Sequence, residues 1–461
     1  MLIPFFVQFL YGEENNIFLS SATVTVFIGI LLVLTNLEES RKLNLQQAFL
    51  LTTLSWLSIA IFGCIPFLLS DLNLSLIDAF FESISGITTT GSTIITQLDN
   101  APKSILIWRS ILQWLGGIGI IVMAITILPL LNIGGMQLFR MEGNETTEKI
   151  LPKTREITLV LSIIYLGLTF LCGIAYWSVG MNIFDSIAHA MTTIATGGFS
   201  TYSNSIGHFQ NPRVEIISTI FIILGSIPFI AYLKFVKGDK KIFFKDSQIK
   251  GLIYILVFSV IVMFIYLILN NKEYNFLDNL RISTFNVVSI LSGTGYVTSD
   301  FGLWGKFPLI FFLFLMFIGG CAGSTTCGIK IFRFQIIGRF ILNQIKKLVY
   351  PHGVFSIKYN SEKVSDRFIY SIITFVFLYF VIFFILTALL SLDGLDFVTA
   401  LSGAASSISN VGPGLGDVIG PNGNYSNLPS FSKLVLAFGM LLGRLELFAV
   451  LVLFFPSFWK N

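Results

Sequence analysis

Long apolar stretches alternate with short polar loops along almost the whole chain of 461 residues. Most stretches approach or exceed the roughly 20 residues that a helix needs to cross a membrane. They cover residues 17–36, 46–70, 104–133, 156–179, 213–236, 249–270, 306–340, 367–391 and 431–456. The pattern predicts one membrane bundle of about nine or ten helices. The stretch 306–340 is too long for one span, and glycines between Gly319 and Gly328 interrupt it.

Four further stretches are too short or too polar to cross, and each contains a glycine-rich segment. They cover about 76–95, 183–200, 277–298 and 395–416, with the segments SGITTTGST (85–93), MTTIATGGFS (191–200), LSGTGYVTS (291–299) and SISNVGPGLG (407–416). One glycine in each aligns as an anchor: Gly91, Gly197, Gly295 and Gly412. An aspartate precedes each anchor by about one helix length, and we expect it to cap a short helix: Asp78, Asp185, Asp278 and Asp396.

This spacing predicts a unit of span, short pore helix, glycine-rich loop and span, used four times in parallel about an axis along the membrane normal. The fold class is therefore all-α integral membrane, with four such repeats around a pseudo-four-fold pore axis and an N-terminal span. The expected boundaries are 1–45 (N-terminal membrane segment), 46–133 (repeat 1), 156–236 (repeat 2), 249–340 (repeat 3, with a broken gate helix) and 366–456 (repeat 4).

Non-helical backbone at membrane depth is tolerated only where protein buries it or where it lines a watery path. Four such loops around one axis can present carbonyl oxygens, which replace the water shell of a monovalent cation. This chemistry suits potassium or sodium. The expected filter residues are Thr89, Thr90, Gly91, Thr196, Gly197, Thr294, Gly295, Val411 and Gly412.

Composition and charge support a membrane transporter and weaken other classes. Residues are 54% hydrophobic and only 12% charged, with mean hydropathy +0.82, too few charges for a soluble enzyme or a disordered chain. A membrane enzyme would need clustered acids, histidines or a nucleophile, and no such cluster is visible; a scaffold would not need the repeated loops. A net charge of +4 gives no sign of nucleic-acid binding. Twenty of the 29 Lys and Arg residues lie on one side, which we expect to be cytoplasmic, with the glycine-rich loops on the other side. These twenty stand in the basic loops 37–45, 134–155, 237–250 and 333–367 and at Lys234 and Lys460.

Several motifs resemble the TrkH/KtrB family of potassium-uptake proteins, and TrkH most of all. They are DAFFESISGITTTGST (78–93), LQWLGGIGIIV (112–122), GGMQLFR (134–140), GGFST (197–201), IGGCAGST (318–325), NVGPGLG (410–416) and GRLELF (443–448). The resemblance covers nearly the whole chain. It implies a potassium filter with potassium as the transported ion, a homodimer, and a cytosolic TrkA-type nucleotide-binding regulatory subunit. It also implies a bacterial inner membrane with the filter facing the periplasm.

The resemblance further implies an intramembrane gate at the glycine break. The expected gate residues are Gly319, Gly320, Gly323, Ser324, Thr325, Thr326, Gly328, Lys330 and Arg444. Thr326 and Cys327 stand where the family is usually glycine-rich, and Ser292 and Gly293 depart from it in the third loop. The family has two helices ahead of its repeats, so residues 2–11, too short to span, are interpreted as the remainder of one.

Some alternatives stay open at this point. A sodium-permeable or sodium-coupled pore would use the same fold, although glycine at all four anchors favours potassium. Channel-like flow and proton-coupled symport need the same filter. Arg109 is expected to extend toward the outer interface, Lys330 either to do the same at the inner end or to bind the gate, and His189 to be a packed neutral side chain.

Overall fold

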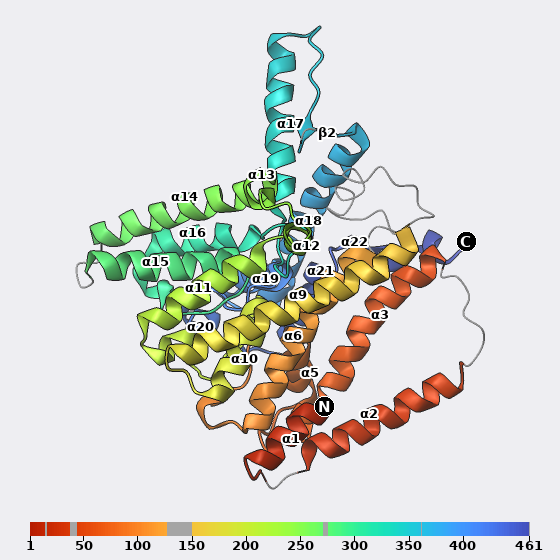
Figure 1. Cartoon of the computed structure of the whole chain (residues 1–461), viewed down its shortest axis with the longest axis vertical. Coiled ribbons are helices and arrows are strands. Elements are labelled where there is room, and N and C mark those ends of the chain that lie inside the picture. Colours follow the sequence, from red (N-terminus) through yellow and green to blue (C-terminus); the bar gives the residue numbers. More distant parts are fainter. Residues whose placement is uncertain (14–15, 37–43, 127–149, 271–274, 361, 461) are drawn as a thin grey trace.

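A computed structural model describes residues 1–13, 16–36, 44–126, 150–270, 275–360 and 362–460. The motif GGMQLFR (134–140), the end of the first predicted repeat (127–133) and most of the basic loops 37–45 and 134–155 lie outside the described residues. Two helices precede the repeats, α1 (Leu2–Leu10) and α2 (Ile17–Leu34), and α1 packs against α6 (Lys103–Thr126). Most of the stretch 2–11 therefore forms a helix of its own, α1, close to the start of α2 (Figure 1).

Single spanning helices account for most of the predicted stretches. Within the described residues, six helices are long and apolar enough to cross a membrane, and eight if each of two bent pairs counts as one span. The six are α2, α3 (Leu45–Gly63) with its extension α4 (Ile65–Leu68), α6, α9 (Ile150–Ser178), α14 (Ser247–Asn270) and α18 (Asp366–Leu392). Apart from one short hairpin, the described chain has the predicted all-helical membrane architecture.

Four shorter helices lie where pore helices are expected: α5 (Leu76–Ile87), α10 (Ile183–Ile194), α15 (Phe276–Leu291) and α19 (Phe397–Ser409). Their N-caps differ from the prediction. Only Asp396 caps its helix; the other caps are Ser75, Asn182 and Asn275, each three residues before the expected aspartate. Asp78 and Asp185 instead sit in the first turn and accept hydrogen bonds from the cap side chains, at 2.7 and 2.6 Å. A first-turn carboxylate still favours the positive helix end, so both arrangements begin a helix.

Within the described residues, the second helices of the second, third and fourth repeats are broken, whereas the sequence suggested a break only in the third. The pair α11 (Pro212–Ser226) and α12 (Phe229–Val236) bends by 87°, because Pro228 cannot continue the hydrogen-bond ladder of α11. The pair α21 (Ser430–Arg444) and α22 (Phe448–Leu451) bends by 110° at Glu446 and Leu447, both with positive φ. Between α16 (Lys306–Phe317) and α17 (Ile331–Val349) lies a non-helical segment, which we call the intramembrane loop (residues 318–330).

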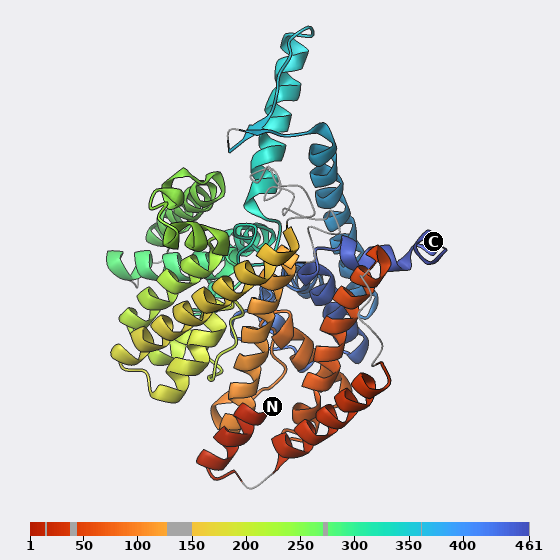
Figure 2. The same ribbon diagram turned by 45° about the vertical axis from the view of Figure 1, so that its right-hand side comes forward.

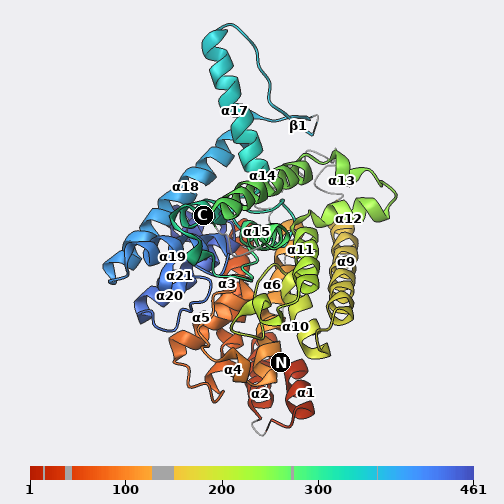
Figure 3. The same ribbon diagram turned by 90° about the vertical axis from the view of Figure 1, so that its left-hand side faces the viewer.

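Short elements complete the chain. Helix α13 (Ile242–Lys245) precedes α14, α20 (Gly416–Ile419) follows the fourth repeat's loop, and antiparallel strands β1 (Lys358–Tyr359) and β2 (Glu362–Lys363) pair Tyr359 with Glu362. The 3₁₀ turns are Leu98–Asn100, Ser205–Phe209, Phe301–Trp304, Val452–Phe454 and Pro456–Trp459. Figures 1 to 3 agree that α17 projects beyond the helical bundle, at the end opposite α1.

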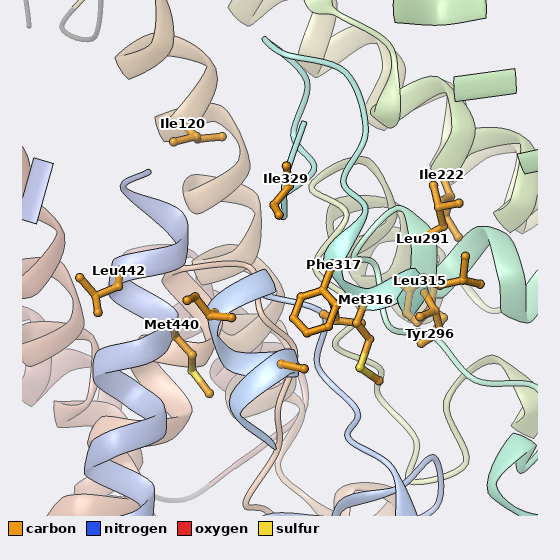
Figure 4. Close-up of a cluster of buried hydrophobic side chains, with 14 of the residues drawn as sticks. Ile120, Ile222, Leu291, Tyr296, Leu315, Met316, Phe317, Ile329, Met440 and Leu442 are labelled. Atoms are coloured by element: carbon orange, nitrogen blue, oxygen red, sulfur yellow. The ribbon is translucent and has the colours of Figure 1, made fainter. Parts of the chain in front are cut away.

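The interior joins all four repeats in one buried apolar cluster. Figure 4 shows Ile120 of α6, Ile222 of α11 and Phe317 of α16 in this region, with Ile329 of the intramembrane loop and Leu442 of α21. Each of these side chains is at most 9% exposed. Because apolar side chains outside the bundle meet lipid rather than water, close packing around this interior is what holds the repeats in one arrangement.

Candidate ion filter and gate

The four pore helices end in the same backbone turn. The first residue past each turn is left-handed, with φ of 54° at Thr89, 49° at Thr196, 72° at Gly293 and 53° at Asn410. The amide of the next residue closes back on the helix, over 2.9 Å from Thr90 to Ser85, Gly197 to Thr192 and Thr294 to Ser289, and 3.0 Å from Val411 to Ser406. This is a Schellman-type ending, repeated four times. We call the segments around these turns (residues 88–94, 195–201, 292–298 and 409–415) the anchor loops.

A second positive φ follows two residues later and corrects the sequence alignment. It falls at Gly91, Gly295 and Gly412, as expected, but at Gly198 rather than Gly197 in the second repeat. The sequence has two adjacent glycines there, and letter matching chose the wrong one. Gly197 instead corresponds to Thr90, Thr294 and Val411, because its amide makes the equivalent closing hydrogen bond.

The four anchor glycines connect the loops in a closed ring. A Cβ atom added to Gly91 would lie 2.3 Å from the carbonyl oxygen of Gly197, and one on Gly198 would lie 1.9 Å from that of Thr294. The same construction places Gly295 against Val411, at 2.0 Å, and Gly412 against Thr90, at 2.8 Å. The anchor glycine of each loop therefore packs against a carbonyl group in the next loop, namely that of the residue just before the next anchor. The anchor of the fourth loop packs in the same way against the first loop, which closes the ring. A side chain at any anchor would force this ring apart.

The ring opens into a hollow of about 150 Å³. All four anchors line it, together with Ser92, Val297, Pro413 and Tyr425. The Tyr425 hydroxyl donates to the carbonyl of Gly412 over 2.8 Å, and the Tyr425 amide donates to Thr93 over 2.9 Å. The segment before α21 is therefore hydrogen-bonded to both the fourth and the first anchor loops.

Hydroxyl side chains on the pore helices support the anchor loops from behind. Ser85 donates to the carbonyl of Ser92 over 2.7 Å, and Ser289 donates to that of Tyr296, also over 2.7 Å. Ser406 donates to the carbonyl of Gly412 over 3.0 Å. The second repeat has Thr192 at this position, 2.5 Å from the hydroxyl of Tyr296 in the third loop. Sequence reasoning missed this set, although a hydroxyl six residues before each corrected anchor is a readable pattern.

Three residues before these hydroxyls, polar side chains hold the outer part of three loops. Glu82 accepts from the amide of Ile94 over 2.8 Å, the ring of His189 lies 3.0 Å from the Ser200 hydroxyl, and Asn286 donates to the Thr298 hydroxyl over 3.0 Å. His189 is buried, as expected, but it supports a loop rather than merely filling space. The fourth repeat has Gly403 at this position.

The expectation for Arg109 was wrong, because this side chain does not reach toward the interface. It is 1% exposed and pairs with Glu82 at 2.7 Å. It also donates to the hydroxyl of Thr93 over 2.7 Å and to the carbonyl of Ser200 over 2.8 Å, and it lies 3.9 Å from the ring centre of Phe199. The guanidinium thus joins the first and second anchor loops. An acid alone in an apolar segment was the missed signal.

Gln113 of α6 is a second missed residue. Its amide nitrogen donates to the carbonyl of Gly197 over 2.5 Å, and its amide oxygen accepts from the amide of Phe199 over 3.0 Å. Both groups of one side chain are therefore used on the second anchor loop. A glutamine inside a predicted span was the available signal.

The intramembrane loop lies beneath the anchor loops, closed at its base by a bridge between Ile318 and Ile329. It leans on the break in the second repeat, where the carbonyl of Gly225 accepts from the Thr325 amide at 3.3 Å and from its hydroxyl at 3.0 Å. The Thr325 hydroxyl also lies 3.2 Å from that of the left-handed Thr196. On its other side, Cys327 Sγ lies 3.9 Å from the hydroxyl of Thr89.

The loop's own polar groups hold its shape. The hydroxyl of Thr326 accepts from the amide of Gly320 over 3.1 Å and lies 2.7 Å from the hydroxyl of Ser324. Lys330 donates to the carbonyl of Thr326, which is the second of its two expected roles. Gly323 and Gly328 have positive φ, and a Cβ on Gly319 would lie 1.8 Å from the carbonyl of Cys327. Every predicted gate residue on this segment therefore lies in one folded loop.

Arg444 connects this loop to the rest of the pore region. It is 2% exposed, and it donates to the carbonyls of Thr325 over 3.1 Å and of Gly116 in α6 over 2.8 Å. Its guanidinium also lies 2.6 Å from Cys327 Sγ. A positive charge and three repeats thus meet at one point below the ring.

A neighbouring ion pair was also missed. Arg333, which the sequence assigned to a basic loop, is 2% exposed and bonds to Glu446 over 2.5 Å. Its guanidinium lies 3.6 Å from the ring centre of Phe375. The pair joins the start of α17 to the break in α21, and it exists only because that helix ends before Glu446.

Comparisons with known proteins agree with this architecture. The profile of the TrkH family, described as cation transport protein, matches residues 14–461. The chain is 40% identical to "Trk system potassium uptake protein TrkI" of Halomonas elongata and 37% identical to "Trk system potassium uptake protein TrkH" of Vibrio parahaemolyticus. The alignments cover the whole chain and 94% and 96% of these relatives. The crystal structure of the potassium transporter TrkH from Vibrio parahaemolyticus superposes with a TM-score of 0.92 at 35% identity, over 99% of this chain and 95% of that one. A family profile that spans almost the whole chain, and a solved relative of the same fold, show that this chain belongs to the TrkH family of membrane cation transport proteins.

Proposed function

We propose that this protein takes up potassium ions across the bacterial inner membrane, through a filter of backbone carbonyl groups. The observation that carries the proposal is the closed ring of four anchor glycines, each against a carbonyl of the next loop. The proposed filter residues are those predicted from the sequence, together with Gly198. Gly198 is the second anchor, and Gly197 remains in the filter as the residue before it, with its carbonyl in the ring. The printed names of the relatives, which describe potassium uptake, support the choice of ion.

The chemistry follows from the backbone. Carbonyl oxygens can replace the hydration shell of a monovalent cation without a fixed charge. The four pore helices end at the ring, and their negative C-terminal ends stabilise a cation there. Glu82 contacts the first loop through the amide of Ile94, but it is already paired with Arg109, so it does not supply a free charge to the pathway.

The intramembrane loop and Arg444 form the proposed gate below the filter. The loop contacts the left-handed residues of two anchor loops, and the buried guanidinium of Arg444 donates to the loop's Thr325 carbonyl. A cation leaving the filter would meet this positive charge. Opening then requires the loop to move away from Arg444, and a cytosolic TrkA-type subunit is the proposed agent, consistent with the relatives' description as parts of a Trk system.

The proposed assembly is a homodimer whose basic side faces the cytoplasm and whose anchor loops face the periplasm. The projecting helix α17 supports the dimer. It exposes Ile341, Ile345 and Leu348 on one face, by 51%, 53% and 82%. A helix outside the bundle with an apolar face of this kind is stabilised by covering that face.

Rescue of a potassium-uptake-deficient bacterium at low external potassium tests the function. Wild-type protein should restore growth and rubidium uptake, and sodium flux measured alongside should be much smaller. Gly412→Ser and Gly91→Ser should both lower the potassium-to-sodium ratio, with the larger loss at Gly91, where an added atom would approach closer. An unchanged ratio in both variants contradicts the filter assignment, while sodium uptake by the wild type as large as that of rubidium favours a sodium-permeable pore.

A further inference from the structure

A basic hollow of about 620 Å³ lies where α13, α14, α17 and the hairpin strand β1 meet, and none of the proposed filter or gate residues lines it. Figure 3 shows these elements near the end from which α17 projects. Four basic side chains line the hollow: Lys245, Lys250, Arg339 and Lys358. The lining also contains one acid, Asp246, whose carboxylate accepts from the amides of Gln248 and Ile249 at the start of α14. The lining is therefore positively charged.

The basic groups come from segments that hydrogen bonds hold together. Gln335 of α17 donates to the carbonyl of Ser247 over 2.7 Å, and the Ser247 amide donates to the side chain of Asn360 over 3.2 Å. Arg339 donates to the carbonyl of Lys358 and lies 5.4 Å from the ring centre of Tyr359. The hollow is thus built by packed elements rather than by a row of separate surface lysines.

An apolar path continues from the hollow along the membrane-facing side of α14. Tyr254 and Phe258 follow Lys250 at intervals of one helical turn, so the three share a face, and the two aromatic residues are 72% and 66% exposed. Phe244, which also lines the hollow, is 80% exposed. Basic groups at a helix end, above an exposed apolar face, match a phospholipid with an anionic headgroup and acyl chains.

We propose that this hollow binds the phosphate of an anionic phospholipid, such as a phosphatidylglycerol, whose acyl chains lie along α14. The hollow lies at the basic end of α14, which is the cytoplasmic end in the orientation proposed above. The bound headgroup joins α14 to α17 and β1. It also lies near the gate, because Gln248 in the first turn of α14 accepts from the amide of Ala322 in the intramembrane loop over 2.8 Å. The lipid thereby stabilises the contact between α14 and that loop.

Native mass spectrometry of the purified full-length protein tests this site, with palmitoyl-oleoyl phosphatidylglycerol and phosphatidylcholine added in turn. The variant Lys250→Gln/Arg339→Gln/Lys358→Gln should retain phosphatidylglycerol on the order of a hundredfold less tightly than wild type, since each basic group near an anionic headgroup contributes about fivefold. The matched control is Lys237→Gln/Lys240→Gln/Lys241→Gln, which removes the same charge from exposed positions outside the hollow and should bind like wild type.

A second arm separates the lipid from soluble phosphates. Excess inorganic phosphate should displace little phosphatidylglycerol, because it gains nothing from the apolar path. Equal retention by the triple variant and its control overturns the proposal, as does displacement by phosphate alone, which would indicate a soluble anion. If the triple variant melts early, Lys250→Gln alone should still lower retention about fivefold, and no change there also overturns the site.

Discussion

Glu82 and Arg109 form the only ion pair among the described residues in which both side chains are at most 1% exposed. It touches two anchor loops through Thr93, Ile94 and Ser200. Glu82→Gln should destabilise the protein by about 3–5 kcal/mol, because it leaves Arg109 buried without a counter-charge. Thermal unfolding in a fixed detergent measures this, and potassium selectivity should fall with it.

The double variant Glu82→Gln/Arg109→Met provides the control for that loss. Removing both charges should recover much of the stability, since the uncompensated charge, rather than the missing bond, causes the cost. Unfolding of Glu82→Gln at the wild-type temperature would show that the pair does not hold the loops.

The sequence predicted Arg444 as a gate residue but did not predict its partners, the carbonyls of Thr325 and Gly116. We expect Arg444→Gln to raise potassium flux without a partner, because two like charges about 4 Å apart repel by roughly 4 kcal/mol at an effective dielectric constant near 20. Arg444→Lys keeps the charge and should stay nearly closed. Rubidium uptake into vesicles compares the three proteins, and a lower flux in Arg444→Gln at normal stability would assign Arg444 a structural role instead.

Sequence reasoning found the glycines that repeat among the loops. It missed the hydroxyl set six residues before them and the residues whose partners are distant in the chain. Gly91, Gly295 and Gly412 stood out because only glycine suits their positive φ. Gly198 was missed since two neighbouring glycines look alike until backbone angles distinguish them. Gln113 and Arg333 depend on partners more than eighty residues away, which no local pattern shows.

At the scale of elements, the intramembrane loop gives the next prediction. Thr326 fixes the loop through two contacts, so Thr326→Gly/Cys327→Gly should increase partner-dependent flux by widening the loop's conformational choice, by up to about 1 kcal/mol per residue. Deleting residues 323–328 should permit flux with no partner. Gly338→Ala, on α17 with open space around the added atom, is the control. A folded deletion protein that stays closed without its partner would show that the barrier lies elsewhere.

The cap of α19 predicts an acid dependence. The hydrogen bond with Thr399 holds the pKa of the Asp396 carboxyl below its usual range. A carboxyl with a depressed pKa stabilises the fold above its unfolded pKa, and this stabilisation is lost as pH falls through the folded pKa. Asp396→Asn should therefore melt like wild type at neutral pH, since asparagine also caps helices. Its melting temperature should fall less than that of wild type between about pH 5 and about pH 3.

Asp417→Asn, which removes the same charge from an exposed position nearby, is the matched control and should follow wild type. Parallel melting curves for Asp396→Asn and wild type across the acid range would refute the assigned linkage.

Helix existence was predictable and helix continuity was not. Apolar length located the spans, because lipid requires it. The breaks after Ser226 and Arg444 were not predicted, because each lies inside a stretch that is apolar overall (213–236 and 431–456), and only Pro228 is a helix-breaking residue. Three of the four caps were misassigned by three residues, because an aspartate in the first turn and one at the cap both favour helix initiation.

At the scale of the whole molecule, the projecting helix α17 predicts the assembly. Ile345→Glu/Leu348→Glu should convert the proposed dimer to monomers, because a charged pair cannot be buried in an apolar contact without a large cost. Light scattering of the detergent-solubilised protein measures the mass. Lys346→Glu, on another face of the same helix, should leave the dimer intact. A dimer that survives the double substitution would show that its interface lies on other elements.

The closed ring of anchor loops has a consequence for how this pore can vary. In a channel built from four identical chains, every substitution occurs in all four filter loops, so the four contacts between neighbouring loops must stay alike. Here one polypeptide supplies all four loops, and the contacts between them already differ. The guanidinium of Arg109 joins the first and second loops, whereas the hydroxyls of Thr192 and Tyr296 meet between the second and third repeats. A mutation changes one loop only, and the strain from an added side chain acts on the one loop against which that anchor packs. A single substitution can therefore alter selectivity through one anchor loop, while the other three loops keep the arrangement that supports conduction.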